Sequence, residues 1–220
     1  MMPRFRRKRM ESFVRIMRPS RGARILDVGG LPNLHSLPGF WQNGTTEFNV
    51  TLLNLPGAYA GFSKTELAPF NLIEADACSC SSLPGTYDII FSNSVIEHVG
   101  SSQRQRAFAN FVRSHGRDYW IQTPSPCFPI EAHCNAPFWW LMASNSRIKT
   151  IRDWKKANHI FLARQMATTR PVRIDLLRSL FPDCSILKER FLGMQKSYIA
   201  YRRNTLDWTG TIGEGLLSRR

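Results

Sequence analysis

The sequence predicts an α/β fold: a doubly wound sheet, mostly parallel, with helices on both faces and an antiparallel strand near its C-terminal edge. Short apolar runs alternate along most of the chain with segments whose apolar residues recur every three or four positions. Strands that alternate with helices in this way form parallel sheets. The last two apolar runs, residues 185–191 and 197–202, have no helical segment between them, which favours an antiparallel pair.

The expected strands are short apolar runs bounded by turn-forming residues. They lie at residues 23–28, 48–53, 72–75, 87–92, 118–122, 185–191 and 197–202. After the fifth strand, residues 123–170 are rich in proline, aromatic and basic residues. We therefore expect this long segment to be irregular, as functional lids in compact domains often are.

Three helices are predicted from their boundary signals. Residues 9–18 carry one apolar face and are ended by a proline, so we expect a lead-in helix that packs on the main domain. A second helix follows a cap at Ser101 or Ser102 and stops at Gly116. A third runs over residues 171–181, with a proline in its first turn.

The length of 220 residues suits one well-buried domain. We expect a basic arm and lead-in helix over residues 1–23, one domain over residues 24–203 that contains an insertion at 124–170, and a tail over residues 204–220. The hydrophobic fraction of 43% and the charged fraction of 21% are typical of globular proteins. No apolar run approaches the roughly 18 residues that span a bilayer.

Charge and cysteine content narrow the class of protein. No apolar stretch follows the basic N-terminus, so we expect no secretion signal and a cytoplasmic location. The five cysteines are odd in number, which argues against a disulfide framework, and no pair has the spacing of a zinc site. The net charge is +14, and nine of the first 24 residues are basic. Such a cluster attracts nucleic acid, anionic lipid or an acidic substrate, or is simply a solvated arm.

Glycines and polar residues follow the expected strands. Ligands in such sheets bind beyond the carboxyl ends of the strands, so these positions form the candidate site. Gly29 and Gly30 allow a sharp turn close to a ligand, although a plain strand-to-helix turn explains them nearly as well. Asn54 follows the second strand, where nucleotide-binding domains usually carry a carboxylate for ribose hydroxyls. Asp76 follows the third, where a carboxylate can accept a hydrogen bond from an adenine amino group.

Five segments follow one another along the chain: ILDVGG, VTLLNLP, IEADA, YDIIFSNSVIEHV and the TP that ends the fifth strand. In this order they resemble the type 11 family of class I S-adenosylmethionine-dependent methyltransferases, which have a Rossmann-like fold. YDIIFSNSVIEHV is the most specific, and the resemblance spans residues 24–203. It implies S-adenosylmethionine as the cofactor. The implied contacts are Asp27, Gly29 and Gly30 to the methionine part, Asn54 to the ribose, Asp76 and Ala77 to the adenine, and Asn93 near the methyl-bearing sulfur.

The sequence departs from the family pattern at three positions. Leu31 and Asn33 stand where the family has its second and third loop glycines, and Asn54 stands where it has the ribose carboxylate. An amide can accept one hydrogen bond and donate another, but it lacks the charge of a carboxylate. These departures leave open a non-catalytic domain with a degenerate cofactor loop.

Methyl transfer is an in-line displacement in which the protein mainly orients the reactants. An oxygen acceptor must also lose a proton, and the candidate general bases are His98, after the fourth strand, and His133, in the segment PIEAH. Each also has a plain structural interpretation, His98 at a helix start and His133 in a loop. Some quinone-pathway relatives bind a metal there through two glutamates and a histidine, but Ser94 replaces the first glutamate, so we expect no metal.

The resemblance favours transfer to a small-molecule, sugar-linked or lipid-linked acceptor, at oxygen. The basic arm leaves RNA as an alternative acceptor, although residues 93–96 (NSVI) lack the Asn/Asp-Pro-Pro-aromatic motif of enzymes of this fold that methylate base amino groups. We expect residues 124–170 to act as a lid or acceptor-binding insertion. Within it, residues 137–142 (PFWWLM) are either a pocket wall or core packing by a short helix. The oligomeric state does not follow from the sequence.

Overall fold

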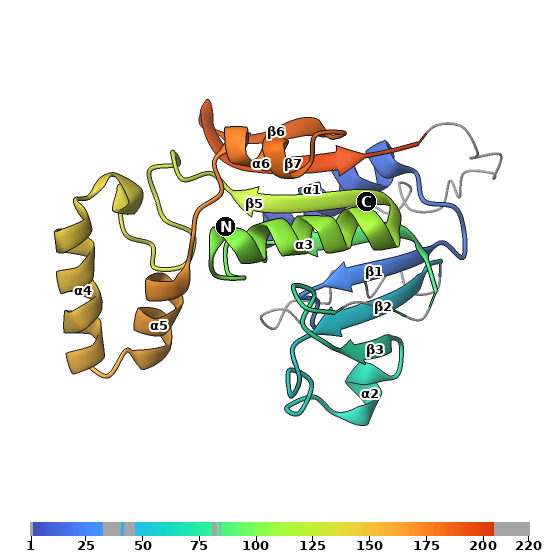
Figure 1. Ribbon diagram of the computed structural model, residues 1–220, viewed down its shortest axis with the longest axis horizontal. Coiled ribbons are helices and arrows are strands. Elements are labelled where there is room, and N and C mark those ends of the chain that lie inside the picture. The colour runs from blue at the N-terminus through green and yellow to red at the C-terminus, as the bar shows by residue number, and fades with distance from the viewer. Residues whose placement is uncertain (1, 33–40, 42–46, 81–82, 84, 205–220) are drawn as a thin grey trace. The chain divides into compact units, whose positions relative to one another are not determined.

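The computed structural model describes residues 2–32, 41, 47–80, 83 and 85–204 of the chain (Figure 1). Asn33, one of the positions that departs from the family pattern, lies outside these residues, as does the tail from residue 205 onward. None of the helices in this part of the chain is long and apolar enough to cross a membrane.

The strands form one seven-stranded sheet with the order β3-β2-β1-β4-β5-β7-β6. Their bounds are β1 Arg24–Val28, β2 Asn49–Asn54, β3 Asn71–Glu74, β4 Tyr87–Asn93, β5 Gly116–Pro124, β6 Ser185–Phe191 and β7 Met194–Arg202. β1 is parallel to β2 and β4, β2 is parallel to β3, and β6 is antiparallel to β7. The predicted fold class, a mostly parallel sheet with an antiparallel strand near the C-terminal edge, is therefore confirmed.

The helices are α1 Met2–Met17, α2 Lys64–Leu67, α3 Ser102–His115, the 3-10 helix η2 Trp139–Leu141, α4 Ser144–Lys156, α5 Ile160–Thr168 and α6 Ile174–Leu180. The three expected helices correspond to α1, α3 and α6, but α6 begins at Ile174, so Pro171 precedes the helix and is not in its first turn as predicted. Ser101 caps α3, because its hydroxyl oxygen accepts a hydrogen bond from the backbone N–H of Arg104 at 3.3 Å. α1 begins at Met2 and not at Arg9 as predicted, since the arginines and lysine of the arm are good helix formers.

The chain divides into two compact units. The first contains Met1–Asn93, Phe111–Trp120 and Arg202–Arg220, and therefore holds α1 and β1 to β4. The second contains Ser94–Asn110 and Ile121–Tyr201, and holds α4, α5, α6 and β6.

The core of the first unit joins α1 to the sheet strands. Phe13 of α1 is fully buried, and its ring meets those of Phe91, Trp120 and Trp41 edge-on, at centroid distances of 5.2, 5.6 and 5.9 Å. Burying a phenylalanine side chain contributes about 1.5–3 kcal/mol. The predicted role of the first helix, packing an apolar face on the main domain, is therefore confirmed.

The second unit contains two helices where the sequence predicted an irregular segment, so that prediction is wrong. α4 and α5 lack the usual start signal, since neither has a side-chain cap at its N-terminus. α4 also buries no residue completely, so its apolar stripe is weak. α4 ends before Asn158, which has a φ of 61°, the left-handed conformation of a common helix stop. Trp139 of η2 is buried and stacks on Trp154 of α4 at 5.2 Å.

Candidate functional site

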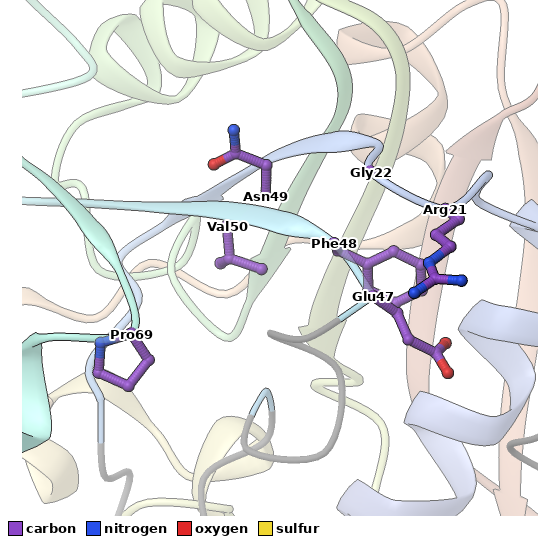
Figure 2. Close-up of a pocket in the computed structure, with 7 residues that line it drawn as sticks. All are labelled: Arg21, Gly22, Glu47, Phe48, Asn49, Val50 and Pro69. Atoms are coloured by element: carbon purple, nitrogen blue, oxygen red, sulfur yellow. The ribbon is translucent and has the colours of Figure 1, made fainter.

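A hollow of about 360 Å³ in the first unit lies at the amino ends of β1 and β2 (Figure 2). Its walls are formed by Arg21, Gly22, Glu47, Phe48, Asn49, Val50 and Pro69. Ligands of parallel sheets bind at the opposite, carboxyl ends of the strands. None of the residues proposed from the sequence lines this hollow, which is therefore not the candidate site.

The loop after β1 has the two glycines for separate steric reasons. Gly29 has a φ of 80°, and its N–H donates a hydrogen bond to the carbonyl oxygen of Leu53 at 2.7 Å. A side chain at Gly30 would place its Cβ 2.7 Å from the carboxyl group of Asp27 and 2.9 Å from a methyl group of Leu52. The first glycine therefore sets the backbone turn, and the second leaves room for Asp27.

Asp27 has a buried carboxyl group that accepts a hydrogen bond from an uncharged side chain. Its side chain is 8% exposed, and Trp41 Nε1 donates a hydrogen bond to Oδ2 at 2.8 Å. Burial raises the pKa of Asp27 to about 7, and the hydrogen bond from Trp41 lowers it only in part. Among the residues that the structure describes, no basic side chain contributes to this pKa.

Asn54 ties the loop after β1 to the end of β2. Its amide nitrogen donates to the carbonyl oxygen of Gly30 at 3.2 Å, and its amide oxygen accepts from the backbone N–H of Leu55 at 2.8 Å. A carboxylate could not donate the first of these bonds, which gives a physical reason for the departure from the family pattern. One amide N–H and one oxygen lone pair are left over for a ligand by this count.

The other candidate cofactor residues also make local contacts. Asp76 accepts a hydrogen bond from the backbone N–H of Cys78 at 2.9 Å and so shapes the turn after β3, which contains the buried Ala77. Asn93, at the end of β4, accepts a hydrogen bond from the guanidinium of Arg9, which is itself 5% exposed. All seven candidate cofactor residues lie in the first unit.

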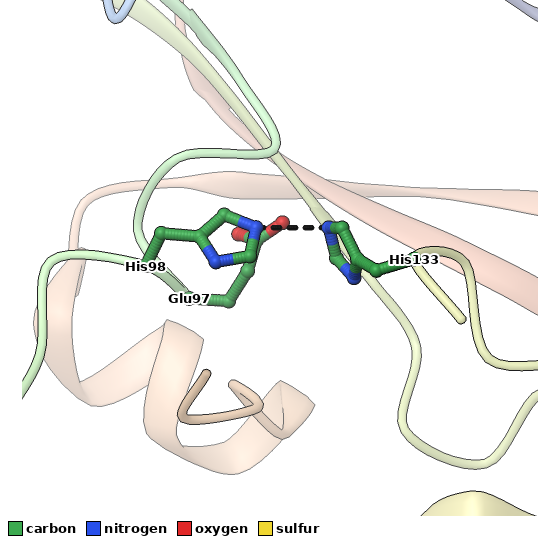
Figure 3. A group of neighbouring side chains, drawn as sticks. All are labelled: Glu97, His98 and His133. Atoms are coloured by element: carbon green, nitrogen blue, oxygen red, sulfur yellow. Dashed lines mark hydrogen bonds between the residues drawn. The ribbon is translucent and has the colours of Figure 1, made fainter. Parts of the chain in front are cut away.

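The two candidate bases, His98 and His133, lie together in the second unit (Figure 3). Their Nε2 atoms are 2.8 Å apart, and the rings meet edge-on at a centroid distance of 4.5 Å. The sequence singled out both histidines but gave no reason to pair them. The pairing arises because the loop that carries His133 and the loop after β4, which carries His98, meet in this unit.

Hydrogen bonds at the outer nitrogens fix how each ring is protonated. His133 Nδ1 is 2.8 Å from Glu131 Oε1, so this nitrogen carries a hydrogen that the carboxylate accepts. Thr169 donates its hydroxyl hydrogen to the carbonyl oxygen of Gln165 at 2.8 Å. Its oxygen therefore accepts from His98 Nδ1, 3.2 Å away. Sequence reasoning missed Glu131, although it stands two positions before His133, and it had no signal for Thr169, which is 71 residues from His98.

Glu97 completes the cluster, and Figure 3 shows its carboxylate beside the dashed line that joins the two rings. It is 2% exposed, and its Oε2 accepts a hydrogen bond from the hydroxyl of Thr123 at 3.0 Å. Its Oε1 is buried and has no hydrogen-bond partner. Burial raises the pKa of Glu97 to about 7.

The two imidazoles have opposite pKa shifts. Burial and the neighbouring His133 lower the pKa of His98 to about 4. Burial also opposes protonation of His133, but its hydrogen bond and charge interaction with Glu131 raise its pKa overall. At neutral pH His98 is therefore the neutral imidazole of the pair, and His133, which the carboxylate of Glu131 supports, is the more basic one.

The sequence matches no protein-family model and no curated protein. In structure it is similar to the N-methyltransferase NodS from Bradyrhizobium japonicum, with a TM-score of 0.55 and 11% identity over 91% of this chain and 96% of NodS. It is also similar to a proposed O-methyltransferase from Nostoc punctiforme, with a TM-score of 0.57 and 11% identity over 92% of this chain but only 57% of that one.

A third similar structure is phosphoethanolamine N-methyltransferase 2 from Haemonchus contortus, solved with S-adenosylmethionine, at a TM-score of 0.53 and 13% identity over 82% of this chain and 38% of that one. Identities this low establish the architecture only. The strand order, the antiparallel pair at the C-terminal edge and these similarities together show that the chain has the fold of the class I S-adenosylmethionine-dependent methyltransferases, as its sequence predicted.

Proposed function

We propose that the protein transfers a methyl group from S-adenosylmethionine to a hydroxyl group of a small-molecule, sugar-linked or lipid-linked acceptor. The observation that carries this proposal is the buried carboxyl group of Asp27 beside the glycine turn after β1. A buried carboxylate without a cation is unfavourable. The ammonium group of the cofactor's methionine part would supply the missing charge.

The neighbouring loops fit the remaining parts of the cofactor. Asn54 has one amide N–H and one lone pair to offer the ribose hydroxyls. Asp76 and Ala77 are proposed for the adenine, and Asn93 for the region of the methyl-bearing sulfur. When bound, the cofactor supplies the reactive sulfonium methyl, and these residues bind and orient it.

The test is calorimetric titration of the full chain with S-adenosylhomocysteine. Wild type should give a one-site isotherm. Asp27→Asn should weaken binding by at least about 10-fold, because it removes the charge that faces the ammonium group. Asp153→Asn, on the exposed side of α4, is the matched control and should bind as wild type does. No detectable heat at millimolar ligand would overturn the proposal and favour a non-catalytic domain.

Proton removal from the acceptor is proposed for the cluster of His98 and His133. An alkyl hydroxyl attacks a sulfonium methyl poorly while it keeps its proton, and a positioned imidazole is the usual base. His98 Nε2 carries the lone pair of its ring, because the Nδ1 hydrogen is bonded to Thr169, and it faces the Nε2 of His133 at 2.8 Å. A neutral amine acceptor would need no such base.

The segment 124–170 is proposed as the acceptor-binding insertion. Its helices η2 and α5 expose large apolar side chains, with Leu141 at 76% and Phe161 at 80%. Exposed apolar groups of this size favour an acceptor with an apolar part, such as a lipid-linked one. RNA is the second candidate, favoured by the net charge of +14, and strongly salt-dependent RNA binding would support it.

A further inference from the structure

Glu97, His98 and His133 offer three metal-binding atoms within 4.8 Å of one another. Figure 3 shows the carboxylate of Glu97 close to the line that joins the two Nε2 atoms. Two imidazole nitrogens and a carboxylate oxygen are a common donor set for zinc and other first-row transition ions. The cluster lies within the second unit and does not depend on the position of the first.

The histidine pair leaves two lone pairs pointing at each other. Both Nδ1 hydrogens are engaged, with Glu131 and Thr169, so both Nε2 atoms are left as acceptors. At a separation of 2.8 Å, two such lone pairs repel each other unless a cation lies between them. A proton can fill this role by making His133 an imidazolium, and a metal ion can fill it as well.

Glu97 provides the independent reason to favour a metal ion over a proton. A single proton between the two Nε2 atoms leaves Glu97 Oε1 buried and without a partner. An unpaired buried polar atom costs about 1–3 kcal/mol, and more for a charged group. An ion bound by both nitrogens and this oxygen would satisfy all three atoms at once.

The atoms behind the ligands also match a metal site. Ligand histidines usually donate their second ring N–H to a carboxylate or another oxygen, which fixes the orientation of the ring. Glu131 does this for His133, and Thr169 does it for His98. The hydroxyl of Thr123 likewise holds the second oxygen of Glu97 at 3.0 Å.

We infer that Glu97, His98 and His133 bind a divalent transition-metal ion such as Zn²⁺, with at least one coordination position left open. Tetrahedral zinc holds two nitrogens about 3.3 Å apart, given bonds of about 2.0–2.1 Å. The two rings therefore need to separate by only about half an ångström from their present 2.8 Å. The sequence predicted no metal because Ser94 replaces a glutamate, whereas here His133, 35 residues further on, supplies the third ligand.

This inference goes beyond the proposed function and is tested separately from it. With an ion bound, both imidazoles would be ligands, and proton removal from an acceptor would pass to an oxygen held at the open coordination position. The cofactor titration with S-adenosylhomocysteine concerns residues of the first unit only. Metal binding can therefore fail while cofactor binding succeeds, or succeed while it fails.

The experiment is titration of the full chain, first stripped with a chelator, with Zn²⁺ against a chromophoric competitor. We expect one ion per chain. Glu97→Gln and His133→Ala should each weaken binding by about 100-fold or more. Glu131→Gln should weaken it by about 10- to 100-fold, the usual effect of losing a group that orients a ligand. His159→Ala is the matched control, because this exposed histidine starts α5 and should leave binding unchanged.

Co²⁺ substitution identifies the ligands even if a variant folds poorly. The stripped wild-type chain should show visible bands of a tetrahedral or five-coordinate ion with nitrogen and oxygen ligands. A sulfur-to-cobalt charge-transfer band would place the ion on the cysteines and overturn the inference. Absence of Zn²⁺ binding at about 100 μM, or equal binding by wild type and Glu97→Gln with an unchanged circular dichroism spectrum, would overturn it as well.

Discussion

Replacing Asp27 with asparagine tests whether the fold holds this carboxyl group at a cost in stability. Burial raises the pKa of Asp27 from 3.8 to about 7 in the folded protein. Below about pH 4 the group is protonated in both the folded and the unfolded chain, so the raised pKa does not lower the free energy of unfolding there. As the pH rises from about 4 to about 7 the unfolded chain ionises first, and the folded state loses stability.

The size of the effect follows from the two pKa values. The difference between 3.8 and about 7 corresponds to about 4 kcal/mol, at about 1.4 kcal/mol for each pKa unit. Asparagine has nearly the same shape, does not ionise, and its amide oxygen can keep the hydrogen bond from Trp41. Asp27→Asn should therefore match wild type near pH 4 and be more stable by as much as about 4 kcal/mol at pH 8.

The assay is urea unfolding of the ligand-free protein, followed by tryptophan fluorescence at about pH 4.5, 6 and 8. Other groups that titrate in this range, such as Glu97, are present in both proteins and cancel in the comparison. Asp153→Asn, in which the replaced group is exposed, should follow wild type at every pH. A difference between Asp27→Asn and wild type that stays constant with pH would refute the assignment of a raised pKa to Asp27.

The remaining predictions concern catalysis and packing. His98→Ala should lower the rate of methyl transfer to a known hydroxyl acceptor by about 10²- to 10⁴-fold and leave the affinity for S-adenosylhomocysteine unchanged. A normal rate would show that His98 is not the catalytic base. Gly30→Ala should lower the free energy of unfolding by about 1–3 kcal/mol, because the added Cβ would lie 2.7 Å from the carboxyl group of Asp27. Gly61→Ala is the control in the same melting experiment, because a Cβ added there would meet nothing within 4 Å. Phe13→Ala should lower the free energy of unfolding in urea by about 3–5 kcal/mol. Phe161→Ala should lower it by less than about 0.5 kcal/mol, because that side chain is 80% exposed, and equal losses in the two variants would contradict the packing of α1.

Local patterns predicted the sheet well, because each strand has its own apolar run and its own turn residues. The strand expected at residues 185–191 coincides with β6, and the antiparallel partner follows after one turn. The pattern failed for α4 and α5, because neither has a capping side chain at its N-terminus and α4 buries no residue. These helices depend on contacts such as the stack of Trp139 on Trp154, which no window of sequence shows.

The candidate site was predicted as separate residues and not as an arrangement. Strand ends pointed to Asp27 and to His98, because parallel strands bring their carboxyl ends to one edge. Nothing in the spacing indicated that His133 meets His98, since the two are joined only through the tertiary fold. For the same reason the hydrogen bond from Asn54 to Gly30, which explains a missing carboxylate, could not be predicted.

The hydrogen bond from Arg9 to Asn93 determines how the basic N-terminus should be studied. Arg9 is buried, so shortening the chain past it removes a cation from the side chain at the end of β4 as well as charge from the surface. A loss of activity in a truncated protein could then be assigned wrongly to the missing surface charge, when its cause is the displacement of Asn93. Arg7 and Lys8 are exposed, and among the described residues Arg7 makes only the surface ion pair with Glu11 at 3.5 Å. Neutralising these two side chains while keeping Arg9 changes the charge of the helix and leaves its attachment to β4 intact.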